Sequence, residues 1–176
     1  MALTEKEKKA KEAQLVRQMA GKLRDDIVTL EKFKTDKPPA TFLEFCSIRR
    51  HHNDIQGLIY VIQERMPWVA ELLPANIGDW VIQAKMKALA SFIEISRKFV
   101  GDPPLTLTGS LTARDVLTNE CKNFSDARDF FNKILMEQAL DDKTADALDK
   151  TLMMIDETIE IIEKLLSKSV NYLDEF

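Results

Sequence analysis

The fold class follows from the last stretch of the chain, residues 142–176, which reads DKTADALDKTLMMIDETIEIIEKLLSKSVNYLDEF. Its apolar side chains recur at alternating steps of four and three residues: Leu148, Leu152, Ile155, Ile159, Ile162 and Leu166. Neither proline nor glycine interrupts the stretch, so the spacing predicts one helix about 50 Å long at ~1.5 Å per residue. A second apolar row lies beside the first, which makes the predicted buried face wider than a two-stranded coiled coil needs. Such a face is typical of a helical bundle.

Four earlier segments show the same helical spacing, and prolines and glycines separate them. These segments cover residues 4–34, 41–66, 79–101 and 112–140. Thr4 with Glu7, and Thr41 with Glu44, have the spacing of a capping box at a helix start. Pro67 is expected to close the second helix, because proline lacks the amide hydrogen that an interior turn needs. Residues 67–74 are then expected to form two short turns of helix.

Together these segments predict an all-α protein. The predicted architecture is an elongated antiparallel helical bundle of four to five helices, with long, coiled-coil-like N- and C-terminal helices. A chain of 176 residues fits a single domain, residues 1–176. Residues 1–14 have no continuous apolar face, so they predict either a projecting arm that docks on a partner or a frayed terminus. Residues 105–112 alternate apolar and polar side chains, which predicts either a small hairpin or an ordered loop.

Composition and charge narrow the class of protein. Hydrophobic residues make up 45% and charged residues 31%, which is typical of a folded domain. No apolar run approaches the roughly 18 residues that a membrane span needs, and the N-terminus lacks the apolar core of a signal peptide. We therefore expect a cytoplasmic protein with no membrane contact. For Cys46 and Cys121 we favour reduced core thiols over the alternative of a disulfide. The net charge is −4, with a basic excess over residues 1–37 and an acidic excess over residues 141–176.

The sequence contains no motif that carries catalytic chemistry. A glycine-rich phosphate loop, a nucleophile elbow and a Cys-x-x-Cys pair are all missing. The two histidines, His51 and His52, are adjacent, and successive helical side chains point about 100° apart, so they do not share one metal ion easily. Ile48 and Arg49 stand where a carboxylate-bridged di-iron bundle carries its glutamates. We therefore expect no enzymatic activity, no cofactor and no metal site.

The best candidate for a binding site is a polar run inside the second helix: Arg49, Arg50, His51, His52 and Asn53. Two arginines, two histidines and an amide suit an acidic protein partner or nucleic-acid phosphates. The competing interpretation is a solvated helix midsection whose arginines pair with acidic residues of the last helix. Near the proline-bounded corner, Trp68, Leu72 and Trp80 are expected either to plug the open end of the bundle, which we favour, or to form an exposed anchor for a partner.

These observations favour a non-enzymatic protein–protein interaction protein. It would be an adaptor, an assembly factor or a structural subunit, whose partner is another protein or a second copy in a homo-oligomer. The alternative is a nucleic-acid-binding accessory protein that uses the Arg-Arg-His-His run. The acidic net charge argues against that alternative, because nucleic-acid-binding domains usually carry a basic excess.

Overall fold

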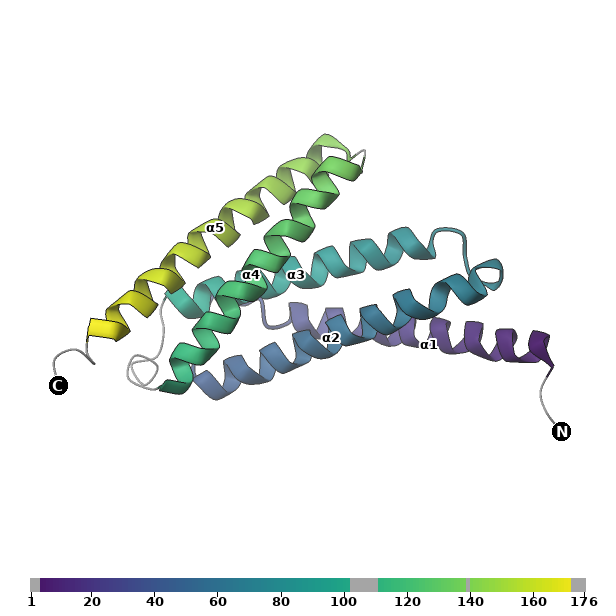
Figure 1. The fold of residues 1–176 in the computed structure, drawn as a ribbon, viewed down its shortest axis with the longest axis horizontal. Helices are drawn as coiled ribbons and strands as arrows, with labels where there is room; N and C mark the ends of the chain where they lie inside the picture. The colour runs from purple at the N-terminus through teal and green to yellow at the C-terminus, as the bar shows by residue number, and fades with distance from the viewer. Residues whose placement is uncertain (1–3, 102–110, 139, 172–176) are drawn as a thin grey trace. The chain divides into compact units, whose positions relative to one another are not determined.

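The computed structural model describes residues 4–101, 111–138 and 140–171 of the chain (Figure 1). The described residues form five α-helices and one short 3-10 helix, without a strand: α1 (Glu5–Glu31), α2 (Phe42–Val69), η1 (Ala70–Leu72), α3 (Ile77–Gly101), α4 (Leu111–Glu137) and α5 (Asp142–Asn171). The predicted all-α helical fold is confirmed. Residues 105–110 of the predicted hairpin or loop lie outside the described residues, as do residues 172–176 of the predicted last helix. Nowhere in the described part does a helix combine the length and apolarity of a membrane span.

The helices form two compact units. The first unit comprises Met1–Lys34 and Ser47–Phe92, and the second comprises Thr35–Cys46 and Ile93–Phe176. Helix α1, most of α2, η1 and the first part of α3 therefore belong to the first unit. Helices α4 and α5 belong to the second unit, together with the first turn of α2 and the last turns of α3. The single domain over residues 1–176 stays a prediction.

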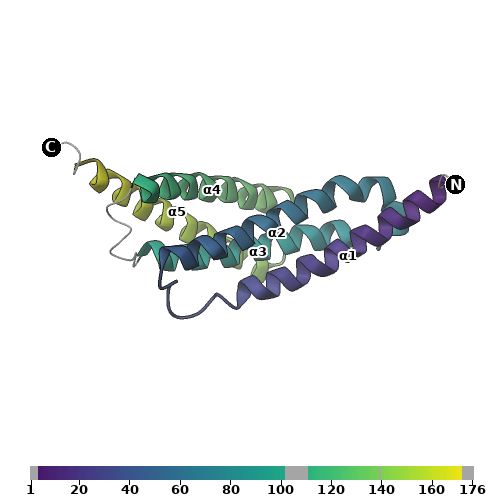
Figure 2. The ribbon, with the colours of Figure 1, turned by 90° about the horizontal axis from the view of Figure 1, so that it is seen from below.

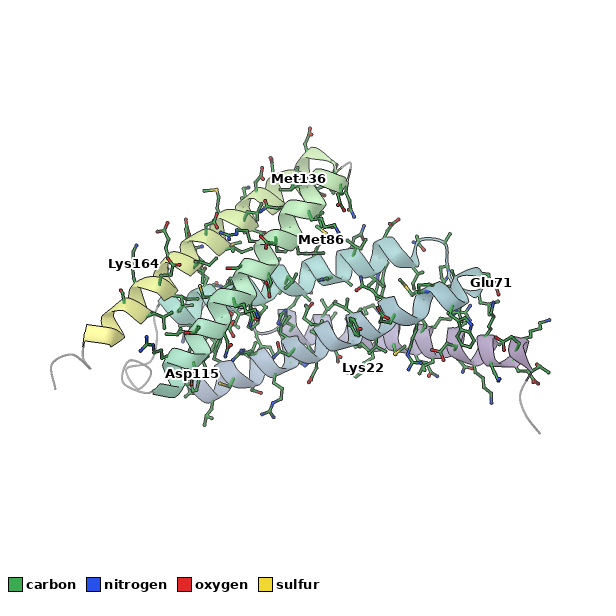
Figure 3. The ribbon with its side chains drawn as sticks, viewed as in Figure 1. Lys22, Glu71, Met86, Asp115, Met136 and Lys164 are labelled. Carbon is green, nitrogen blue, oxygen red and sulfur yellow. The ribbon has the colours of Figure 1, made fainter. Side chains whose placement is uncertain are left out.

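Helix α1 begins where the capping box predicts. The Glu7 amide donates to the Thr4 hydroxyl at 3.3 Å, and the Thr4 amide donates to the Glu7 carboxylate at 2.8 Å. One side of the helix is buried in the first unit, through Ala13, Val16, Leu23, Ile27 and Leu30. The second half of the predicted arm is joined to this unit by two ion pairs. The Lys9 ammonium lies 2.9 Å from the carboxylate of Glu71 (Glu71 in Figure 3), and Glu12 pairs with Arg65. Projection or fraying of the preceding residues stays a prediction.

The two ends of α2 differ in how well the sequence predicted them. At its start the Glu44 amide donates to the Thr41 hydroxyl at 3.1 Å, and the Glu44 carboxylate accepts the Ala40 amide at 2.8 Å. At its end the prediction was wrong, because Pro67 lies inside the helix, which continues to Val69. A proline is tolerated more easily in the last turn than in the helix interior, and the carbonyl that loses its donor belongs to an exposed residue, Gln63.

The next connection is also shorter than predicted. We expected two short turns of helix over residues 67–74. In the structure α2 runs to Val69, and the 3-10 turn η1 (Ala70–Leu72) follows it directly, before α3. Helix α3 begins at Ile77, so Asp79 lies in its first turn rather than capping it. The Trp80 amide donates to the Asn76 carbonyl at 3.0 Å, which closes the first turn of α3.

Helices α4 and α5 lie side by side in the second unit and run in opposite directions (Figures 1 and 2). The apolar spacing that predicted α5 identifies part of its core, since Leu148, Ile155 and Ile162 are buried whereas Leu152, Ile159 and Leu166 are half-buried. Four residues of α4 are buried too: Phe124, Ala127, Phe131 and Ile134. Asp141 caps α5, because its carboxylate accepts both the Thr144 amide and the Thr144 hydroxyl at 2.9 Å. In the same unit, the Phe45 and Phe99 rings stack with their centroids 4.1 Å apart.

Candidate interaction surface on helix α2

The predicted binding run, residues 49–53, is helical, but its side chains do not share one surface. His52 is buried and stacks on Phe92 of α3, with ring centroids 4.2 Å apart and planes 6° from parallel. The Gln56 side-chain amide nitrogen donates to His52 Nε2 at 3.1 Å, an arrangement that needs a neutral imidazole. Burial, together with the nearby positive charges of His51 and Arg49, lowers the pKa of His52 to about 4. His52 is therefore a core residue of the first unit.

Two further residues of the run are engaged within the protein. The His51 Nε2–H donates to the Asp26 carbonyl at 2.9 Å, which ties α2 to α1. Arg49 is half-buried and makes an interaction within the described structure. Only Arg50 and Asn53 of the five predicted residues are exposed. The run therefore divides into three residues engaged within the protein and two surface residues.

Arg50 belongs to a second, exposed stripe along α2. Its members follow the alternating steps of four and three residues over five turns: Arg50, Asp54, Gly57, Val61, Glu64 and Trp68. The core stripe of the same helix, which includes Ile48, Ile55 and Ile59, lies on the opposite side and is buried. We call the six exposed residues, together with the adjacent Tyr60, the outer face of α2.

The outer face of α2 combines exposed apolar groups with charges. The side chain of Tyr60 is 64% exposed and that of Trp68 is 45% exposed. Val61 lies between them at 36% exposed. Arg50, Asp54 and Glu64 carry charges of both signs along the same stripe. Aromatic groups beside charged ones are typical of protein–protein contact surfaces.

The residues at the proline-bounded corner do not plug the unit as expected. Trp68 and Leu72 are 45% and 38% exposed, and Trp80 is half-buried. The reason is that Val69 fills the core position at this end of α2, which turns Trp68 outward. The Leu72 backbone is nevertheless held, because the Arg17 guanidinium donates to its carbonyl oxygen. Trp68 and Leu72 thus extend the exposed apolar surface rather than close the core.

Two features that catalytic sites often use can be checked in the described residues, a metal-binding cluster and a reactive thiol. The described residues contain no group of three or more His, Cys, Asp or Glu side chains placed to hold a metal ion. Cys46 and Cys121 are free and half-buried rather than fully in the core. Burial raises the pKa of the Cys121 thiol, and the Glu163 carboxylate raises it further, so the reactive thiolate is disfavoured.

Sequence reasoning missed most of the outer face of α2. It identified Arg50 and Trp68 but grouped them with buried neighbours. A signal was present, because residues 50, 54, 57, 61, 64 and 68 repeat with the same spacing as the core stripe in a shifted register. The same spacing places His52 in the register of Ile48, Ile55 and Ile59, but residues 49–53 were interpreted as one polar surface.

No protein-family model matches the chain, and neither a curated protein nor a solved structure shows significant similarity to it.

Proposed function

We propose that this protein is a non-enzymatic protein–protein interaction protein that self-associates, as an adaptor, an assembly factor or a structural subunit does. One observation carries the proposal: Tyr60, Val61 and Trp68 are exposed together on the outer face of α2. A single exposed apolar residue is ordinary on a protein surface. Here three of them lie within about two and a half turns on one side of one helix.

The exposed aromatic groups are not needed to complete the core of the first unit. That core is already filled from all three helices, by residues such as Leu23 of α1, Ile59 of α2 and Ala88 of α3. Tyrosine and tryptophan are enriched where partners bind, because they bury a large area and lose little side-chain entropy. Covering Tyr60 and Trp68 with a partner would remove this apolar area from water.

The test is light scattering on a sizing column over a range of protein concentrations, at low and high salt. We expect wild type to contain an oligomer, and the double variant Tyr60→Ser with Trp68→Ser to shift towards monomer with unchanged helix content by circular dichroism. The matched control is Met136→Ser with Met153→Ser, because these side chains are 86% and 64% exposed on α4 and α5 (Met136 in Figure 3). A wild-type protein that stays monomeric under all conditions would contradict the proposed self-association.

A further inference from the structure

Gly57 is an unexpected residue for its position. It lies in the middle of α2 and is exposed, where glycine destabilises a helix relative to alanine. Apart from its two chain neighbours and the adjacent backbone of α2, no atom of the described residues lies within 4 Å of the point that a Cβ of residue 57 would occupy. No close packing within the described part of the chain therefore requires glycine here. A residue without a side chain on an outer helix face allows another backbone to approach closely.

Two of the three charges of the outer face lie at equal distances from Gly57. Arg50 lies seven residues before it and Glu64 seven residues after it, so each is about 10 Å away along the helix axis. Both are exposed, and neither has an ion-pair partner among the described residues. The two charges have opposite signs, which makes the face complementary to a copy of itself turned end for end.

We propose that a second copy of this chain docks on the outer face of α2, in an antiparallel crossing of the two α2 helices at Gly57. This inference rests on the self-association proposed above and specifies its surface. A twofold axis through the crossing point brings Arg50 of each copy to Glu64 of the other, so one contact gives two ion pairs. The exposed Tyr60 then lies opposite Asp54 of the second copy, whose carboxylate can accept the phenolic hydrogen.

The charges also select this register over its neighbours. A parallel pairing about Gly57 would place Arg50 opposite the second copy's Arg50. An antiparallel pairing shifted by half a turn, with the axis near residue 59, would place Asp54 opposite the second copy's Glu64. Both alternatives bring like charges together, which disfavours them. The antiparallel crossing at Gly57 instead pairs charges of opposite sign.

Charge reversal tests the pairing by sedimentation velocity over a range of protein concentrations. Arg50→Glu and Glu64→Arg are each expected to raise the dimer dissociation constant by roughly tenfold or more at low salt, because like charges then meet twice. The double variant Arg50→Glu with Glu64→Arg is expected to return to within about threefold of wild type, since the pairs are rebuilt with the signs exchanged. The control is Arg24→Glu, which makes the same charge change at an exposed position on α1 and should leave the constant unchanged.

Disulfide trapping tests the crossing point without relying on charge. Under mild oxidation Gly57→Cys is expected to form a dimer-linking disulfide, because the proposed crossing brings the two residues within the ~7 Å that such a bond spans. Gln63→Cys is the control, since residue 63 is exposed on a different side of α2. Equal cross-linking of the two variants would overturn the crossing at Gly57.

The outcomes separate this inference from the proposed function. A wild-type dimer that neither single charge reversal weakens would overturn the outer face of α2 as its contact, while leaving self-association in place. Failure of the double variant to recover would overturn the Arg50–Glu64 pairing. A wild type that is monomeric throughout would overturn both proposals.

Discussion

At the scale of single residues, His52 differs most from its appearance in the sequence. Within a run of basic and polar residues it looks like part of a charged surface, yet it is 6% exposed and stacks on Phe92. Its ring accepts a hydrogen bond from Gln56 and is therefore held neutral. Protonation in the folded state would place a charge in an apolar core next to the positive groups of Arg49 and His51.

This environment predicts a loss of stability at acidic pH. In the unfolded chain His52 titrates near its ordinary pKa of 6.5, whereas the folded value is about 4. Between these values the unfolded state binds the additional proton, so the free energy of unfolding falls as the pH falls. This loss in the free energy of unfolding is absent above about pH 7 and amounts to about 2–3 kcal/mol near pH 4.5.

Urea denaturation of wild type and of His52→Phe at pH 7 and pH 4.5 measures this contribution. Phenylalanine preserves an aromatic ring for the stack but has no proton to bind, so the variant should lose less stability than wild type between the two pH values. Carboxylates titrate in both proteins and cancel in the comparison. An equal loss in the two proteins would show that His52 is not the group responsible.

At the scale of helices, the structure distinguishes faces that the sequence leaves alike. Helix α5 carries apolar side chains on both sides of its stripe, yet Ile155 is fully buried while Met153, two residues earlier, is 64% exposed. Thr151 and Thr158 are buried as well, and their hydroxyls donate to the carbonyls of Ala147 at 2.8 Å and Met154 at 2.6 Å. These bonds within the helix let two polar residues occupy a core face.

A matched pair of truncations on α5 tests this assignment of faces. We expect Ile155→Ala to lower the free energy of unfolding by about 2–5 kcal/mol, because it leaves a cavity between α5 and its neighbours. Met153→Ala removes a side chain of similar size from the exposed side and should change stability by less than about 0.5 kcal/mol. Chemical denaturation of both variants at one pH gives the comparison, and similar losses would mean that α5 packs through a different face.

At the scale of the whole molecule, charge bears on the nucleic-acid alternative. The net charge is −4, and of the predicted run only Arg50 and Asn53 are exposed. Non-specific nucleic-acid binding depends on several exposed cations that displace counterions together. A surface with one exposed arginine from the run and acidic residues beside it is poorly suited to that task.

We therefore expect no shift of the protein on a sizing column when mixed DNA or RNA fragments are added at low salt. The comparison protein is the double variant Arg49→Ala with Arg50→Ala, which should elute in the same way under these conditions. A shift that is strong at low salt, weak at high salt and absent in the double variant would contradict this expectation and favour nucleic-acid binding through the run.

The sequence by itself determined the fold class and most helix limits. The spacing of Leu148, Ile155 and Ile162 identifies both α5 and its core side, because a repeat near 3.6 residues allows one buried stripe on a straight helix. Thr4 and Thr41 mark helix starts correctly, since capping depends on residues only three positions apart. The end of α2 was predicted less well, because the cost of Pro67 depends on whether water reaches a carbonyl one turn earlier.

Only the tertiary structure decided how residues 49–53 divide between core and surface. The apolar stripe of α2 marks the buried side in the sequence, but the polar run within it was interpreted as one surface. The contacts that hold its members join residues far apart in the chain, such as His52 with Phe92 and His51 with Asp26. Local spacing carries no information about such partners, so the stacked histidine and its hydrogen-bonded neighbour became visible only when the helices were packed together.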